Sequence, residues 1–137
     1  MRFIMMVIPK GYETAKAGTM PDVKMVERMM KYNESLQEAK VLLDLNGFHP
    51  PAVGARITFA GEKATVTEGP FPGIKETVGG YWLVQCKTKQ EAIDWASRAP
   101  MADGDIIEIR QIQEMSEFPP EIQAAERKLA ASLGTHF

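Results

Sequence analysis

The sequence predicts a single α+β domain whose elements follow the order strand, helix, strand, hairpin, strand, helix, strand. Three observations lead to this prediction. Residues 2–8 are almost continuously apolar, as in a strand at the centre of a sheet. The segments 22–39 and 88–99 carry apolar residues every three or four positions, which is the spacing of amphipathic helices. Short alternating runs bounded by glycine and proline lie between and after them.

The bulk composition is that of an ordinary globular chain. It has 137 residues, 45% of them hydrophobic and 25% charged, which suits one domain with one core. The net charge of −2, without a basic stripe, argues against direct binding of nucleic acid. No apolar run approaches the roughly 20 residues that span a bilayer. No cleavage site follows residues 2–8, so we expect neither a membrane segment nor a signal peptide.

The single cysteine, Cys86, has no partner in the chain, which favours a reducing compartment and hence a cytoplasmic location. Because no base lies near it in the sequence, its thiol is expected to be buried and unreactive. The chain lacks the His and Cys spacing of zinc sites and the glycine-rich loops that bind phosphates. The sequence therefore predicts no metal and no cofactor.

The first helix is expected to begin at Asp22, whose carboxylate can accept a backbone N–H hydrogen bond. Its core-facing residues share one side of the helix: Met25, Met29, Tyr32, Leu36 and Ala39. The chain has nine methionines, which suggest an adaptable apolar surface. Because Met25 and Met29 have core spacing, we assign no methionine to a cofactor.

A second strand is predicted after the helix, because Val41, Leu43 and Leu45 alternate with their neighbours. Continuation of the helix is the alternative. The segments 55–60 and 63–67 flank a Gly-Glu pair and predict a β-hairpin.

The stretch 69–73 is dense in glycine and proline and predicts a shaped loop before a strand over 81–86. Thr88 and Glu91 form a capping-box pair that starts the second helix. This helix is expected to stop before Pro100.

The last strand is predicted over residues 105–113. Ile107 and Ile109 alternate there with Glu108 and Arg110, so the two pairs should lie on opposite faces.

A C-terminal helix is predicted to start at a pair of prolines and to form an appendage over residues 119–133, ended by Gly134. Its apolar stripe of Ile122, Leu129 and Leu133 is too narrow for central burial.

This order predicts the split β-α-β arrangement of ferredoxin-like folds, with an inserted β-hairpin and a C-terminal helix. Both central helices should cover one face of the sheet. The other face carries Val, Leu and Ile side chains and would be open in a monomer. We therefore expect a homodimer in which two open faces pack together.

Short motifs follow one another from Met1 to about Ile112. They are Gly47-Phe48-His49-Pro50, Glu68-Gly69-Pro70-Phe71, Lys75-Glu76, Gly79-Gly80-Tyr81-Trp82-Leu83-Val84, Glu91-Ala92-Ile93-Asp94-Trp95-Ala96, Pro100 and Ile107-Glu108-Ile109-Arg110. In these motifs the chain resembles the YCII-related family, specifically its DGPF-type branch. The resemblance implies a ferredoxin-like subunit of a dimeric α/β barrel with an active-site cleft.

The resemblance also implies two kinds of function. Family members with a paired histidine and aspartate are expected to be enzymes, and some DGPF-type relatives are expected to be partners of alternative sigma factors. Here Glu68 stands in place of the Asp of the motif and is one methylene longer. The histidine that YCII proper carries early in the first helix has no counterpart, which leaves His49 as the candidate.

His49 and Glu68 are the candidate catalytic residues. A histidine changes its protonation near neutral pH, and a carboxylate such as Glu68 or Glu76 can orient it. Because His49 and Glu68 flank the hairpin, we expect them to face a common cleft that also receives Arg110 from the last strand or Lys75 from the loop. The alternatives are that His49 is a surface residue beside two prolines and that Glu68 accepts N–H groups of its loop.

Arg110, Lys75, Glu76 and Phe71 are the candidate substrate-binding residues. Arg110 would hold a carboxylate in the barrel interior, or else pair with Glu108 or across the dimer. Lys75 would bind an anionic group and Glu76 would shuttle a proton, or both are simply solvated. Phe71 lines a pocket or packs in the core.

Two classes of function follow. The first is a metal-independent acid–base enzyme, a lyase or isomerase, or a binder of a small polar metabolite. The second is a regulatory interaction module, for example a sigma-factor partner, for which the C-terminal helix offers the surface.

Overall fold

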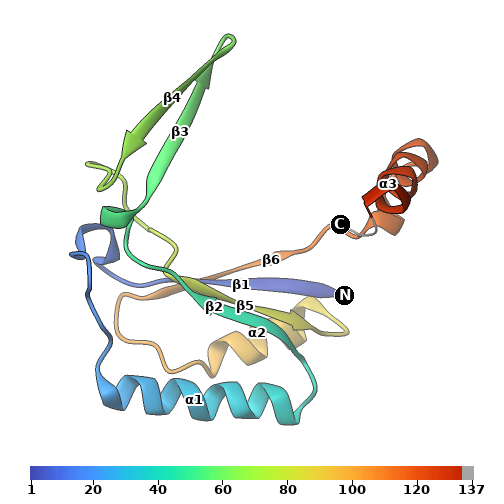
Figure 1. Cartoon of the computed structure of the whole chain (residues 1–137). Helices are drawn as coiled ribbons and strands as arrows, with labels where there is room; N and C mark the ends of the chain where they lie inside the picture. The colour runs from blue at the N-terminus through green and yellow to red at the C-terminus, as the bar shows by residue number, and fades with distance from the viewer. Residues whose placement is uncertain (134–137) are drawn as a thin grey trace.

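The computed structural model describes residues 1–133, and its helices and strands follow the predicted order (Figure 1). The strands are β1 (Arg2–Ile8), β2 (Leu42–Gly47), β3 (Ala55–Ala60), β4 (Lys63–Glu68), β5 (Gly80–Gln85) and β6 (Ile106–Gln111). The helices are α1 (Val23–Glu38), α2 (Lys89–Ser97) and α3 (Pro120–Leu133), with single turns η1 (Tyr12–Thr14), η2 (Pro51–Val53) and η3 (Met115–Glu117). The helix end predicted at Gly134 lies outside the described residues.

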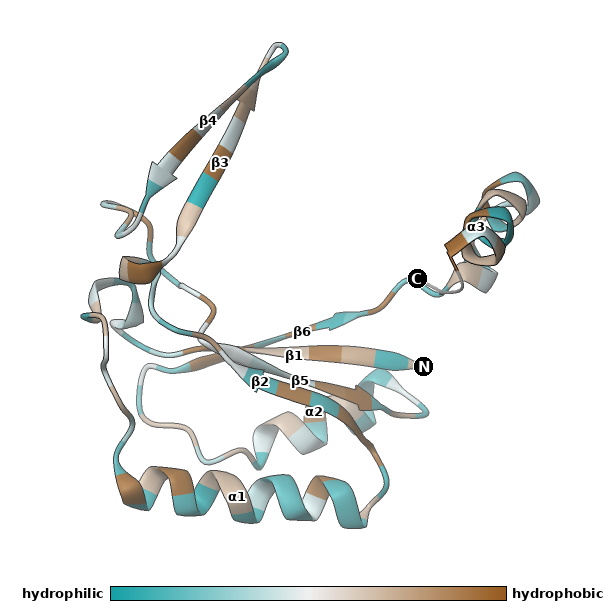
Figure 2. Cartoon of the chain, in the orientation of Figure 1, coloured by the Kyte–Doolittle hydropathy of each residue, from teal (hydrophilic) through white to brown (hydrophobic). Residues whose placement is uncertain are grey.

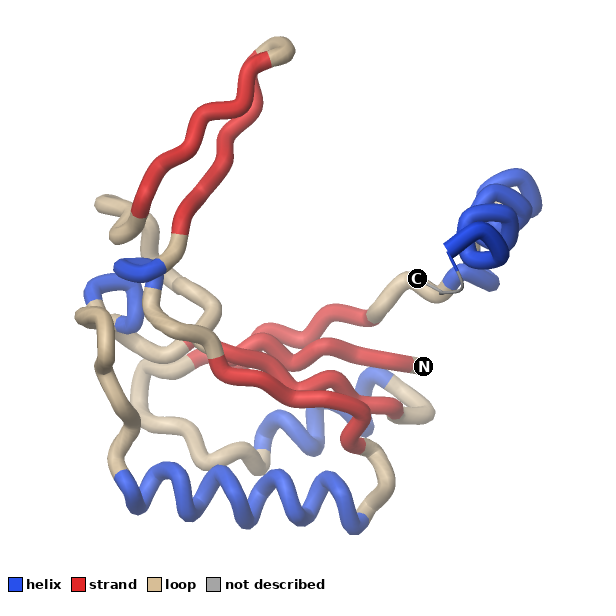
Figure 3. The backbone as a smooth tube through the Cα atoms, in the orientation of Figure 1, coloured by secondary structure: helices blue, strands red, loops and turns tan. Residues whose placement is uncertain are grey.

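The central sheet has four strands in the order β2-β5-β1-β6, and neighbouring strands are antiparallel. The prediction that the first strand is central is confirmed. Helices α1 and α2 lie on the same face of this sheet (Figure 3). This mixed α+β arrangement is compatible with a ferredoxin-like fold. No helix within residues 1–133 is long and apolar enough to cross a membrane.

The core lies between the sheet and the two helices. Its buried residues are Phe3, Met5, Tyr32, Leu36, Val41, Trp82, Val84, Cys86 and Ala92. Strand pairing places Phe3 opposite Val84 and Met5 opposite Trp82, so these side chains share the helix-covered face. The rings of Tyr32 and Trp82 meet edge to face with centroids 5.1 Å apart. The intervening strand residues face the other side of the sheet.

The predicted alternation of the second strand is wrong in one detail. A register shift between Leu42 and Asp44 breaks the alternation. Because this bulge adds a residue, Leu42 and Leu45 rather than Leu43 and Leu45 pair with the core-facing Val84 and Trp82.

The helix starts differ from the predictions in their hydrogen bonds. Asp22 occupies the N-cap position of α1, but its side chain makes no capping hydrogen bond. The carboxylate is exposed, so solvent can hydrate it, and the first N–H groups of the helix are left to solvent. At α2, the Thr88 hydroxyl accepts from the Glu91 N–H (3.1 Å), as predicted. The Glu91 carboxylate accepts instead from the N–H of Lys87 (3.0 Å), one residue before the cap.

Two elements rise from the sheet on the side opposite α1 and α2. They are the hairpin β3–β4 and the helix α3, at opposite ends of the sheet (Figures 1 and 2). The hairpin forms its own two-stranded sheet, and all of its strand residues are exposed. Helix α3 buries only Ala130.

Candidate functional site

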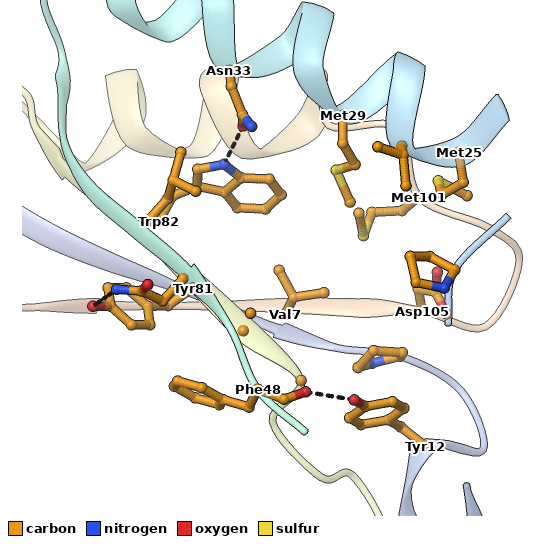
Figure 4. Close-up of a pocket in the computed structure, with 18 of the residues that line it drawn as sticks. Val7, Tyr12, Met25, Met29, Asn33, Phe48, Tyr81, Trp82, Met101 and Asp105 are labelled. Atoms are coloured by element: carbon orange, nitrogen blue, oxygen red, sulfur yellow. Dashed lines mark hydrogen bonds between the residues drawn. The ribbon is translucent and has the colours of Figure 1, made fainter. Parts of the chain in front are cut away.

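A cavity of about 680 Å³ lies between the first half of α1 and the helix-covered face of the sheet (Figure 4). Its walls come from β1, the η1 segment, α1, the end of β2, the start of β5 and the loop before β6. This volume is within the range of small-molecule sites, about 300–1,000 Å³.

Methionines form much of the cavity wall on the α1 side. They are Met20, Met25, Met29, Met30 and Met101. In Figure 4, Met25 and Met29 extend from α1, and Met101 extends from the loop before β6, toward the sheet that carries Val7. Unbranched thioether side chains adapt to irregular shapes and make favourable contacts with aromatic rings. This wall can therefore adjust to the shape of a bound molecule.

On the sheet side of the cavity, three glycines leave part of the wall as backbone without side chains. Gly47, Gly79 and Gly80 line the cavity where β2 and β5 meet. A Cβ on Gly80 would come within 2.7 Å of the Asn46 carbonyl oxygen, and one on Gly79 would come within 2.9 Å of the Pro9 ring. Close backbone packing thus excludes larger residues here.

Few polar groups reach this apolar cavity. The Asn33 Oδ1 accepts a hydrogen bond from Trp82 Nε1 (2.8 Å), which fixes the amide and leaves its NH₂ group with no protein partner in residues 1–133. Asp105 has a structural role, because its two carboxylate oxygens accept from the N–H groups of Lys10 and Ala102, each at 2.9 Å. The Asn33 NH₂ is therefore available to donate a hydrogen bond to a ligand.

His49 lines the cavity and is exposed. The backbone on both sides of it is well held. The Phe48 N–H donates to the Gly79 carbonyl (2.8 Å), the Tyr12 hydroxyl donates to the Phe48 carbonyl, and Pro50 is fully buried. The imidazole of His49 makes no hydrogen bond within the described residues. This anchored backbone presents the imidazole at the cavity with its nitrogens available.

The ends of the inserted hairpin do return to one place. The backbones of Pro51 and Gly69 are so close that a Cβ on Gly69 would lie 1.7 Å from the Pro51 oxygen, and the Gly69 N–H donates to Gly54 (2.8 Å). In the sequence, His49 lies shortly before Pro51, and Glu68 directly precedes Gly69. Glu68 is exposed at the end of β4, and it is not among the residues that line the cavity.

Three other predicted residues lie on the loop that follows β4. Phe71 is half-buried beneath the guanidinium of Arg56, whose Cζ is 5.0 Å from the ring centroid. Lys75 and Glu76 are exposed, and Glu76 has a left-handed backbone with φ 54°. None of the three lines the cavity.

Arg110 faces the open side of the sheet. Its strand register pairs it with Ile4 and pairs Glu108 with Met6, whereas Ile107 and Ile109 pack against the core. The predicted separation of the two faces is confirmed. Arg110 Nη1 lies 3.4 Å from Glu108 Oε2, and both side chains are largely exposed. The sheet thus separates Arg110 from the cavity.

Cys86 is buried in the core, as predicted. Burial raises the pKa of its thiol, and the negative charge of Glu91 raises it further. Both effects favour the neutral, unreactive thiol. Within residues 1–133, no three His, Cys, Asp or Glu side chains are grouped so that they could hold a metal ion.

Sequence reasoning did not predict the roles of Asn33, Asp105 or the methionine wall. A signal for the wall was present in the first helix. Met25 with Val26 and Met29 with Met30 widen its apolar face beyond one stripe. Packing against the sheet covers only part of such a wide apolar helix face, and the remaining methionines line the cavity.

Comparison with known proteins agrees with the resemblance seen in the sequence motifs. Residues 1–116 match the YCII-related domain. No curated protein matches the chain. The match covers most of the chain, including the central sheet, α1, α2 and the hairpin. The chain therefore belongs to the YCII-related family.

Proposed function

We propose that this domain binds a small molecule with a mainly apolar body in the cavity beneath α1. The observation that carries the proposal is the cavity itself, which combines apolar walls with a few polar groups. That combination is typical of ligand sites, where the apolar surface supplies affinity and the polar groups fix orientation. The apolar lining favours a less polar ligand than the small polar metabolite expected from the sequence.

Asn33 and His49 define the chemistry of this proposal. The free NH₂ of Asn33 donates to a carbonyl or similar acceptor on the ligand. His49 exchanges a proton with the ligand, as a lyase or isomerase requires. The position of His49 at the cavity supports this role.

Binding can be tested with anilinonaphthalene sulfonate, a fluorescent probe for apolar cavities. Met25→Trp should fill the cavity and weaken probe binding about tenfold or more. Met115→Trp is the matched control, because Met115 lies in η3 and does not line the cavity. Equal weakening by both variants, or by neither, would contradict the proposal. Once a natural ligand is found, His49→Gln should retain binding and abolish turnover if the protein is an enzyme.

The open face of the sheet supports a homodimer of ferredoxin-like subunits with a barrel between them. Ile4, Met6 and Leu83 share this face and remain half-exposed. Glu108 and Arg110 stand beside one another on the same face, so two copies related by a two-fold axis can pair opposite charges. In such a dimer, the predicted residues Arg110, Glu68, Lys75, Glu76 and Phe71 would belong to an inter-subunit cleft separate from the α1 cavity.

The hairpin gives independent support for a dimer. Its register places Ile57 opposite Val66 and Phe59 opposite Ala64 on one face. The large side chains on this face are strongly exposed: Ile57 is 55% exposed, Val66 61% and Phe59 78%. An isolated two-stranded hairpin is marginally stable in water, so an apolar face of this kind needs a cover.

Light scattering should therefore give twice the chain mass of 15.2 kDa. Phe59→Glu should weaken the dimer, whereas Thr58→Glu, which puts the same charge on the other hairpin face, should not. A monomeric wild type would contradict the dimer. If Phe59→Glu and Thr58→Glu dimerise with equal affinity, the apolar face of the hairpin does not lie in the dimer interface.

A second candidate function is regulatory binding to an alternative sigma factor. The exposed apolar residues Ile122, Leu129 and Leu133 of α3 favour it. A purified alternative sigma factor should then bind the full chain and lose binding after Leu129→Glu. The matched change Lys128→Glu should have a smaller effect. Absence of binding to the full chain would exclude this candidate.

A further inference from the structure

A second, positively charged cleft of about 330 Å³ lies between α1 and α2. Arg28 and Lys31 line it from α1, and Arg98 lines it from the end of α2. The spacing of Arg28 and Lys31, three residues apart, places both on the same side of α1. Three cations from two helices therefore surround one small hollow.

Among residues 1–133, none that lines the cleft is acidic. Within residues 1–133, the ion pairs join Arg2 to Glu114 and Arg110 to Glu108, so none involves a cation of this cleft. The whole chain carries a net charge of −2, so this local excess is not a consequence of a basic composition. Like charges held close together repel, and a bound anion would relieve the repulsion.

The cleft is also partly preorganised. The Tyr32 hydroxyl donates to the Trp95 carbonyl (2.7 Å) and ties α1 to α2. The Arg98 guanidinium lies over the Trp95 ring, with Cζ 3.9 Å from the centroid, and its Nε donates to the Asp94 carbonyl (3.3 Å). The stacked guanidinium keeps its terminal N–H groups available at a defined position.

We propose that this cleft binds the phosphate group of a small phosphorylated molecule. Arginine forks match the oxygen geometry of phosphate, and a nearby lysine adds a compact positive charge. The three cations share one small hollow with Pro100 and Trp95, and its volume suits a single phosphate group better than the backbone of a nucleic-acid polymer. The site is separate from the α1 cavity, because the lining residues of the two do not overlap.

Calorimetric titration of the full chain with inorganic phosphate and with pyrophosphate tests this proposal. At constant ionic strength set with chloride, we expect saturable binding of one anion per chain in the millimolar range or tighter. Arg98→Ala and Lys31→Ala should each weaken binding about tenfold. Lys24→Ala is the matched control, because it removes an exposed cation of α1 that does not line the cleft.

Trp95 offers a second readout that does not depend on heat. With Trp82→Phe, Trp95 is the only tryptophan, and an anion that engages Arg98 should change its fluorescence with the same midpoint as the calorimetry. Lack of saturation by about 10 mM pyrophosphate, or an equal loss in Lys24→Ala, would overturn the proposal. Tighter binding of a single-stranded oligonucleotide than of pyrophosphate, with a steep salt dependence, would overturn the small-molecule assignment.

Discussion

Tyr32→Phe should change how the stability of the protein depends on alkaline pH. Tyr32 is only 6% exposed, and burial raises the pKa of its hydroxyl to about 12, partly opposed by the positive charge of Arg98. The folded protein therefore favours the neutral phenol. The resulting stability is present below about pH 10, where an unfolded tyrosine is also neutral. It is lost as the pH rises from about 10 through 12, because the unfolded chain ionises first.

The size of the effect follows from the structure. At neutral pH the variant loses the hydrogen bond to the Trp95 carbonyl and should be about 1–2 kcal/mol less stable. Raising the pKa of Tyr32 from about 10 to about 12 stabilises the folded protein by roughly 3 kcal/mol, all of which is lost in the limit of high pH. By about pH 11 the wild type should have lost about 1.4 kcal/mol that the variant does not lose. The two proteins should then be about equally stable.

Urea denaturation at several pH values between about 7 and 11, followed by tryptophan fluorescence, measures this difference. The absorbance of tyrosinate, taken as wild type minus variant, gives the pKa of Tyr32 directly. A stability difference that stays constant up to about pH 11, or a difference titration centred near pH 10, would refute the reasoning.

Four further predictions concern the scaffold. Leu36→Ala should cost about 2–5 kcal/mol because Leu36 is fully buried, whereas the neighbouring change Gln37→Ala should stay within about 0.5 kcal/mol in urea denaturation. Thr88→Ala should cost about 1 kcal/mol by removing the α2 cap. Truncation after Glu117 should leave the circular dichroism and cooperative unfolding of a folded domain, and an unfolded product would place α3 in the core or the interface. Arg2 lowers the pKa of Glu114 through a hydrogen bond, so stability from this pair is present at neutral pH and lost as the carboxyl protonates. The stability gap between wild type and Glu114→Gln should therefore narrow in acid.

Most of the elements could be predicted because their signals are local. The core-facing positions Met29, Tyr32 and Leu36 of α1 repeat with helical period, and the structure confirms them as buried or half-buried. The bulge in β2 could not be predicted, since one extra residue leaves apolar residues on both faces of a leucine-rich segment. The missing side-chain cap at Asp22 has a similar cause, because residue type allows a cap and only the local backbone and solvent decide whether it forms.

In the candidate site, too, some features could be predicted from local sequence and others depend on tertiary packing. His49 was chosen as a candidate from its residue type and from the family resemblance. It lines the cavity, and its catalytic role stays a prediction. Asn33 could not be predicted, because its role depends on the hydrogen bond that Trp82 donates from a strand far away in the sequence. Arg110 could be placed on the open face by its alternation with Ile109, but not relative to the cavity.

The sequence by itself determined which segments are helices and strands, which side of most of them is apolar, and that the chain resembles the YCII-related family. These features depend on residue periods of two and about three and a half, which a few neighbouring residues already establish. Only the tertiary structure decided that α1 stands over the junction of β2 and β5 with a methionine-lined space between them, and that Arg28, Lys31 and Arg98 meet at a second cleft. Both sites arise where segments distant in the sequence pack together, and their shapes depend on packing that no local pattern encodes.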